Sequence, residues 1–272
     1  MSIEPMSAPI AALLGVVEGV TEYLPISSTG HLILVGHLLG LEGEGADAFD
    51  IVIQLGAILA VVVQYRKLLL ERTAGLARKE PASIRLLTAL VVGFLPTAVT
   101  GLLLRKTIKR LLFGPMPVVA ALVVGGIVMI VVEMARAKKE QPKDSLEDVT
   151  WQRALTIGLG QCVAMWPGSS RSMCTILAGQ LTGLSTATAA EFSFLLGLPT
   201  LGAATVYEAY KSRHALQGIG VGNVGIGLVV SFVVAWAVIA GFIAYLKKRG
   251  LVPFGVYRII LGIFVFFWLA RG

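Results

Sequence analysis

The hydrophobic positions of this chain fall into long runs separated by short polar segments. Six runs are nearly continuous and approach the length of ~20 residues that a helix needs to cross a bilayer core. They are Phe49–Tyr65, Leu86–Leu104, Pro117–Glu133, Ala190–Val206, Val224–Tyr245 and Phe254–Leu269. This pattern predicts transmembrane helices, so the expected fold class is an all-α polytopic membrane protein.

Two further apolar segments, Pro9–Leu41 and Ala154–Leu184, are interrupted by polar residues. The first contains Glu18, Glu22 and Pro25, followed by Ser-Ser-Thr-Gly, and the second contains Pro-Gly-Ser-Ser-Arg-Ser. Each pattern predicts two short helices joined by a polar turn at membrane depth. Irregular backbone is tolerated there only where protein or a wet cavity surrounds it. We therefore expect two re-entrant helical hairpins.

The two interrupted segments resemble each other. "LPISSTGHLILVGHLLGL" (Leu24–Leu41) and "WPGSSRSMCTILAGQLTGL" (Trp166–Leu184) share Pro-x-Ser-Ser, a short apolar stretch and a closing Gly-x-Leu-x-Gly-Leu. This similarity favours an internal duplication, with repeats over approximately 8–135 and 154–270 of a single membrane domain, 1–272. Each repeat would hold one hairpin and three spans. Because three is odd, we expect the second repeat to be inverted relative to the first.

Composition supports the membrane class and argues against a soluble globular protein and a nucleic-acid-binding protein. Hydrophobic residues make up 56% of the chain, charged residues 14%, and the mean hydropathy is +0.82, whereas soluble domains carry about 25% charged residues. The net charge of +7 would suit a nucleic-acid-binding protein, but the basic residues lie between apolar runs and no nucleic-acid motif is present.

The first basic residue is Arg66, so no cleavable signal peptide is expected. Cys162 and Cys174 lie in an apolar segment and are expected to be buried thiols.

The distribution of positive charge predicts the orientation. The loops over 66–85, 136–153 and 247–249 carry twice as many lysines and arginines as those over 105–110 and 211–213 together with Arg271. The richer side should face the cytoplasm. Both termini and the mouth of the first hairpin would then face outward, and the second hairpin would enter from the cytoplasm.

The first interrupted segment carries two acids and a histidine. Glu18 and Glu22 are spaced i, i+4, so both carboxylates lie on one helix face, where like charges repel. A shared proton, a divalent cation or an opposing arginine would relieve this repulsion. Ser27, Ser28 or Thr29 can cap the next helix, whose first N–H groups form an anion site. His31 lies within that turn. The two acids and three hydroxyl residues close to it in sequence favour a functional role for His31 over a structural one.

The second interrupted segment supplies a cation. In "PGSSRS" (Pro167–Ser172), Arg171 can bind phosphate through a bidentate guanidinium, and Ser169, Ser170 and Ser172 surround it with hydroxyl and backbone N–H donors. Acids, hydroxyls, a histidine and an arginine around a dipole-positive pocket suit phosphoryl transfer. Two other charged residues, Glu191 and Arg258, lie within spans and are expected to form a structural ion pair, with a catalytic role as the alternative.

At these motifs the sequence closely resembles the bacterial undecaprenyl pyrophosphate phosphatase family, also known for bacitracin resistance. The resemblance runs through "EGVTEYLPISSTGHLILVGHLLG", "FDIVIQLGAILAVV", "PGSSRS", "AAEFSFLLGLP" and "YRIILG". It implies the re-entrant, inverted-repeat architecture and the removal of one phosphate from the C55 isoprenoid diphosphate. The product is the monophosphate carrier lipid of cell-wall (peptidoglycan) synthesis. It also implies a divalent cation, Mg²⁺ or Ca²⁺, and a location in the bacterial cytoplasmic membrane with the active site facing outward.

The resemblance also implies roles for individual residues. Glu18 and Glu22 match the acidic pair of the family, assigned to metal binding or acid/base work, and Arg171 matches its phosphate-binding arginine. Ser28 and His31 match candidate nucleophiles or proton handlers, and a metal-bound water stays a third candidate. The surrounding polar contacts are matched by Ser27, Thr29, Ser170 and Ser172. The sequence departs from the family at Met173, where the family commonly has glycine. The larger methionine side chain should narrow the turn or the lipid path.

Two other functions are alternatives to the phosphatase. Inverted repeats with broken helices are typical of transporters, so a flippase of the carrier lipid is the main alternative. Phosphatidic acid phosphatases of the soluble type also use a Ser-Gly-His turn, but their accompanying Lys/Arg and Arg-His motifs are not convincing here. The sequence leaves the oligomeric state open, with a homodimer as one candidate.

Overall fold

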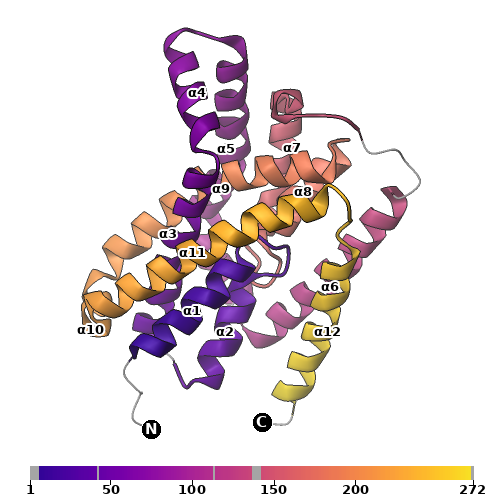
Figure 1. Ribbon diagram of the computed structural model, residues 1–272. Helices are drawn as coiled ribbons and strands as arrows, with labels where there is room; N and C mark the ends of the chain where they lie inside the picture. The colour runs from indigo at the N-terminus through magenta and orange to yellow at the C-terminus, as the bar shows by residue number, and fades with distance from the viewer. Residues whose placement is uncertain (1–5, 42, 113, 137–141, 271–272) are drawn as a thin grey trace. The chain divides into compact units, whose positions relative to one another are not determined.

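The computed structural model describes residues 6–41, 43–112, 114–136 and 142–270, and the regular structure of these ranges is helical (Figure 1). The helices are α1 (Ala8–Thr21), α2 (Ser28–Leu38), α3 (Glu44–Gln64), α4 (Arg66–Ala77), α5 (Pro81–Leu112), α6 (Pro115–Arg136), η1 (Leu146–Asp148), α7 (Trp151–Val163), α8 (Arg171–Leu181), α9 (Thr186–Lys211), α10 (Arg213–Ile219), α11 (Val221–Leu246) and α12 (Val252–Leu269). The segment from Arg66 to Arg85, expected to be a loop, is therefore mostly helical, because α4 and the start of α5 occupy it.

Six of the described helices are long and apolar enough to cross a membrane. Their spans are Gly45–Gln64, Pro81–Leu104, Met116–Arg136, Thr186–Lys211, Val221–Leu246 and Val252–Leu269. The six predicted spans are confirmed, although each helix begins earlier than its apolar run. Large side chains on these helices stay exposed, among them Leu102 at 86% and Val221 at 85%, as expected for surfaces that contact lipid. The chain is a multi-pass membrane protein.

The described chain divides into two compact units, each built from separate segments. The first unit contains the chain up to Tyr23, then Ser28–Tyr65 and Gly197–Gly241. The second contains Leu24–Ser27, Arg66–Leu196 and the chain from Phe242 onward. Each unit draws on both predicted repeats, so neither coincides with one repeat. The single membrane domain of two repeats stays a prediction.

Close helix packing holds the first unit together. A Cβ on Gly15 or Gly19 of α1 would overlap the Val230 and Val234 region of α11, and one on Gly56 of α3 would overlap the backbone of α11. These glycines therefore let α1 and α3 approach α11 closely. The hydroxyl of fully buried Tyr23 donates to the carbonyl of Ala57, 3.0 Å away, which ties the end of α1 to α3.

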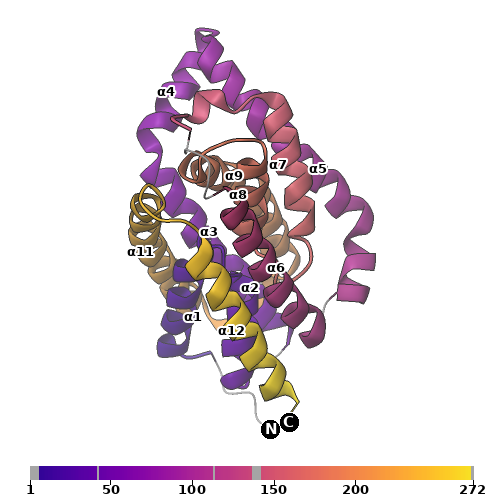
Figure 2. The ribbon, with the colours of Figure 1, turned by 90° about the vertical axis from the view of Figure 1, so that its right-hand side faces the viewer.

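Two helix pairs build the second unit: α5 lies beside α7, and α6 lies beside α12 (Figure 1, Figure 2). A Cβ on Gly158 of α7 would overlap the carbonyl of Gly93 in α5, and one on Gly126 of α6 would overlap that of Gly255 in α12. Small residues allow this approach, which is typical of helix contacts in membranes. Polar contacts add to the first pair, since the Gln161 amide donates to Thr97 Oγ1 at 2.8 Å.

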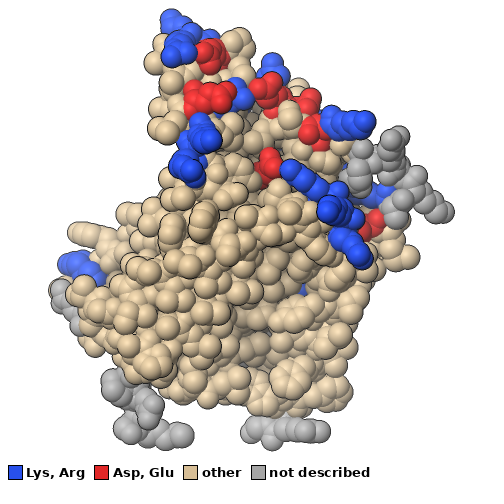
Figure 3. Space-filling view, in the orientation of Figure 1, with Lys and Arg blue, Asp and Glu red and all other residues tan. Residues whose placement is uncertain are grey.

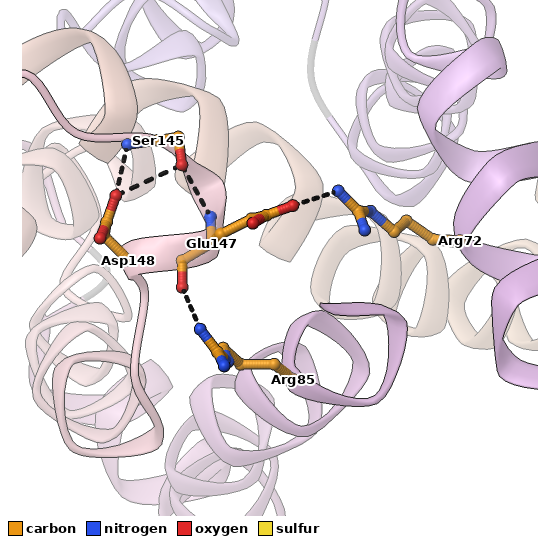
Figure 4. Close-up of polar contacts among 5 residues, drawn as sticks. All are labelled: Arg72, Arg85, Ser145, Glu147 and Asp148. Carbon is orange, nitrogen blue, oxygen red and sulfur yellow. Dashed lines mark hydrogen bonds and ion pairs between the residues drawn. The ribbon is translucent and has the colours of Figure 1, made fainter. Parts of the chain in front are cut away.

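Many charged side chains of the second unit lie at α4, η1, the start of α7 and the end of α11 (Figure 3). There Arg72 pairs with Glu147 at 2.9 Å, and Arg85 donates to the Glu147 carbonyl at 3.1 Å (Figure 4). Ser145 and Asp148 form a capping box on η1. These residues belong to the segments that the charge distribution assigns to the cytoplasm, and this orientation stays a prediction. Lys138, Lys139 and Arg271, which that prediction counted, lie outside the described residues.

Candidate active site

The acidic pair lies at the end of α1. Glu22 follows the last residue of the helix but keeps helical dihedrals (φ −64, ψ −43), and its N–H donates to the Glu18 carbonyl. Glu18 and Glu22 therefore share a helix face, as predicted from their spacing. Both are buried, with exposures of 0% and 6%.

A serine with left-handed backbone separates this pair from α2. Ser27 has φ 74, and α2 begins at the next residue, Ser28. The buried Ser28 hydroxyl donates to Glu22 Oε2 at 2.6 Å. A serine that donates to a buried carboxylate has the geometry of a nucleophile beside its base. Half-buried His31 lies three residues further along α2, on the same helix face as Ser28.

The second motif begins α8 in a similar way. Ser170 has φ 70, and its hydroxyl accepts from the N–H of Met173 at 3.3 Å, so it caps the helix that starts at Arg171. The predicted helix start is confirmed, and its first N–H groups form an end suited to an anion. Ser172 is fully buried. Met173 is also buried and lies against Gly125 of α6, so its side chain fills space between helices.

Arg171 is oriented by side chains from its own helix and from α9. Its Nη1 donates to the carbonyl of Ser193 at 2.9 Å and to the Ser193 hydroxyl at 3.3 Å. The Ser193 hydroxyl lies 2.6 Å from the Thr175 hydroxyl, and the latter donates to the Arg171 carbonyl. This hydrogen-bond network was not predicted. Its signal in the sequence is weak, because Thr175 and Ser193 are two of several hydroxyl residues in α8 and α9.

The predicted ion pair between Glu191 and Arg258 is wrong. Arg258 is fully buried and donates instead to the carbonyls of Pro25, Ala121 and Gly168. Glu191 lines a cavity of about 540 Å³ together with Lys247. The sequence suggested the pair because two opposite charges lay within spans, whereas backbone carbonyls satisfy this arginine.

The predicted site residues are divided between the two units. Glu18, Glu22, Ser28, exposed Thr29 and His31 belong to the first unit, and Ser27, Ser170, Arg171 and Ser172 to the second. Within the first unit the structure brings Glu22 and Ser28 together. Within the second it brings the Pro25 and Gly168 carbonyls to one guanidinium. That the acids and Arg171 act on one ligand stays a prediction.

The acidic pair offers oxygen ligands to a divalent cation. Among the described residues no group of three or more His, Cys, Asp and Glu side chains forms a metal cluster. Mg²⁺ does not need such a cluster, because it is usually bound by one or two carboxylates plus phosphate oxygens and water. Glu18 and Glu22 therefore fit a cation that is completed by a phosphorylated ligand.

Comparison with known proteins assigns this arrangement to a family. The family model described as "Bacitracin resistance protein BacA" matches residues 11–264. The chain belongs to this family. The matched range contains both motifs and Arg258, and the sequence resemblance is thereby confirmed.

Relatives of the chain are similar over nearly its whole length. The undecaprenyl-diphosphatase of Sorangium cellulosum is 58% identical over 262 residues, which cover 95% of this chain and 85% of the relative. That of Rhizorhabdus wittichii is 46% identical over 264 residues, covering 97% and 98%. That of Wolinella succinogenes is 45% identical over 260 residues, covering 95% and 97%.

Proposed function

We infer that the chain is an undecaprenyl-diphosphatase of the bacterial membrane, which hydrolyses the C55 isoprenoid diphosphate to the monophosphate and phosphate. Its relatives carry that name. The observation within the molecule that best supports this chemistry is the 2.6 Å hydrogen bond from Ser28 to the buried Glu22. A phosphatase needs an activated nucleophile, and this contact supplies one.

We propose that the Ser28 hydroxyl attacks the terminal phosphorus of the diphosphate while Glu22 accepts the hydroxyl proton. The bond between phosphorus and the bridging oxygen breaks, and the lipid monophosphate leaves. Water then hydrolyses the phosphoserine, which releases phosphate and restores the Ser28 hydroxyl. The helix places His31 on the same face as Ser28, where it can move a proton in either step.

Arg171 supplies the positive charge of the proposed phosphate site. Its guanidinium is anchored by Ser193 at one nitrogen, and a planar guanidinium suits the oxygens of a phosphate group. The N–H groups at the start of α8 and the hydroxyls of Ser170 and Ser172 add donors. From the first motif, the family resemblance adds Ser27 and Thr29 to this set.

A divalent cation, Mg²⁺ or Ca²⁺, is the proposed cofactor. Glu18 and Glu22 would hold it, and its charge would neutralise the diphosphate oxygens. Two buried carboxylates on one helix face repel each other, and a bound cation lowers the cost of that arrangement. Glu22 would then serve both the cation and Ser28.

The architecture that we propose contains two re-entrant hairpins in an inverted repeat. The helix pairs α1–α2 and α7–α8 support this proposal, because each joins two short helices through a polar turn with a left-handed serine. The charged end around α4 and η1 supports a cytoplasmic location for that end. The diphosphate site would then face outward, where the carrier lipid is released during wall synthesis.

Phosphate release from C55 or C15 isoprenoid diphosphate by the purified protein tests this function. We expect Glu22→Gln and Arg171→Ala to abolish release. Glu147→Gln and Arg85→Ala, at the charged end, should leave it unchanged. Full activity of either site variant would refute the site. Movement of labelled lipid between leaflets without phosphate release would instead favour the flippase.

A further inference from the structure

Arg258 is a buried cation that donates only to backbone among the described residues. It lies in the span α12, has 0% exposure, and its guanidinium donates to Pro25 O at 3.3 Å, Ala121 O at 2.9 Å and Gly168 O at 2.9 Å. A charged side chain within a span is costly, and such residues usually mark function. The contacts of Arg258 therefore need an explanation beyond packing.

Two of the three carbonyls belong to the turns of the two proposed active-site motifs. Pro25 lies in the turn between Glu22 and Ser28, and Gly168 lies in the turn before α8. Counted from the left-handed serine, the two carbonyls occupy the same position, two residues earlier in each turn, although the shared Pro-x-Ser-Ser motif places Pro25 opposite Pro167. These serines are Ser27 with φ 74 and Ser170 with φ 70. A single guanidinium thus bonds the same point of both turns, within the second unit.

The surrounding helices leave just enough room for this guanidinium. A Cβ added to Gly125 of α6 would overlap Arg258 Nη2 and would lie 3.0 Å from the sulfur of Met173. The third carbonyl, that of Ala121, lies one turn before Gly125 on the same helix. Helix α6 therefore holds the guanidinium through the Ala121 carbonyl, and the other two hydrogen bonds of the guanidinium go to the turns.

We propose that Arg258 is a positioning residue that sets the spacing between the two turns, the one that precedes Ser28 and the one that precedes Arg171. This inference rests on the proposed function, because it assumes that both motifs act on the same diphosphate. Arginine suits the task because its planar group presents several N–H donors in fixed directions. Lysine would keep the charge but could not reproduce that geometry. Misplacement of reacting groups by about 1 Å can cost roughly 10²-fold in rate.

Arg136 provides a matched control. It also donates to two backbone carbonyls, those of Gln180 and Leu184, but at the far end of α8. We expect Arg258→Met to lower kcat for C15 diphosphate hydrolysis by about 10²-fold with a smaller change in KM. Arg258→Lys should recover only part of this loss. Arg136→Met should lower the Tm and leave kcat within about twofold. Equal kcat for Arg258→Met and Arg136→Met would overturn the proposal.

Gly125→Ala tests the same contact without removing the arginine, in case Arg258→Met does not fold. The added methyl group should displace the guanidinium and lower kcat at least tenfold. Because it acts through Arg258, it should cause no further loss in an Arg258→Lys background. Wild-type kcat in Gly125→Ala, or losses that multiply in the double variant, would refute the proposal.

Arg171→Ala in the same assay separates this proposal from the proposed function. If Arg171→Ala is inactive while Arg258→Met keeps wild-type kcat, Arg258 is not a positioning residue and the proposed site stands. If Arg171→Ala keeps wild-type activity, the proposed site itself is wrong, and the positioning role falls with it.

Discussion

If Ser28 attacks phosphorus with Glu22 as its base, the two residues work as a unit, and a double-mutant cycle on kcat will show it. Their contact is a 2.6 Å hydrogen bond between two buried groups. A base in this position contributes typically 10²–10⁴-fold. We therefore expect Ser28→Ala and Glu22→Gln each to lower kcat at least about 10²-fold. The double variant should lose no more than the worse single variant, because groups that act together are not additive.

The same contact predicts a measurable loss of stability. A hydrogen bond to a charged group contributes about 1.5–3 kcal/mol, and Ser28→Ala removes a donor from a buried carboxylate. Thermal unfolding in detergent should therefore show a lower Tm for Ser28→Ala. Activity must be measured well below that Tm, so that the loss in kcat reports chemistry and not unfolding.

The assay is phosphate release from C15 diphosphate, measured over a range of Mg²⁺ concentrations. If Glu22 acts only as a metal ligand, high Mg²⁺ should rescue Glu22→Gln, whereas loss of a base is not rescued. Labelled phosphate trapped on Ser28 would identify the nucleophile directly. Losses that multiply in the double variant, or wild-type kcat in Ser28→Ala, would refute the reasoning and leave His31 or a metal-bound water as the nucleophile.

Four further predictions concern the cofactor, the phosphate site and the packing. Chelation of divalent cations should abolish phosphate release, and added Mg²⁺ or Ca²⁺ should restore it; activity that survives chelation would exclude the proposed cofactor. Ser193→Ala removes the hydroxyl that accepts from Arg171 Nη1 and should raise KM several-fold, whereas Ser193→Thr should keep it near wild type. Gly158→Ala would overlap the Gly93 carbonyl and should cost about 1–3 kcal/mol, as overpacking does, seen as a lower Tm. Ser170→Gly relieves a positive φ and loses a cap that glycine replaces at little cost, so its Tm should be at least that of the wild type.

The spans and the ends of the hairpin helices could be predicted because the relevant signals are local. An apolar run of sufficient length identifies a span, and Pro25 and Pro167 mark the breaks before α2 and α8. The spacing of Glu18 and Glu22 likewise determines that they share a face. Helix α4 could not be predicted from hydropathy, because it is short and mixes charged with apolar residues, so it forms no long apolar run. Hydropathy alone cannot separate such a helix from a loop.

The role of Arg258 could not be predicted because its partners are distant in sequence and are backbone groups. From the sequence, the natural partner for a buried arginine is an acidic side chain, and this favoured Glu191 as the partner of Arg258. Carbonyl acceptors are present at every residue, and only the fold selects those of Pro25, Ala121 and Gly168. The hydrogen bonds from Arg171 to Ser193 could not be predicted either, because they join residues of two different helices, α8 and α9, and one acceptor is a backbone carbonyl.

The proposed internal duplication would account for two turns of the same kind that precede different residues. In each of the helix pairs α1–α2 and α7–α8 a left-handed serine precedes the second short helix, and the first residue of that helix is Ser28 in one and Arg171 in the other. A non-glycine residue in this conformation costs about 1–3 kcal/mol and persists only where the surroundings determine it. The bonds from Arg258 to the carbonyl two residues earlier in each turn supply that constraint. The strained turn therefore fixes the direction of the residue that follows it, and the same local structure can present the proposed nucleophile after one turn and the proposed phosphate-binding cation after the other.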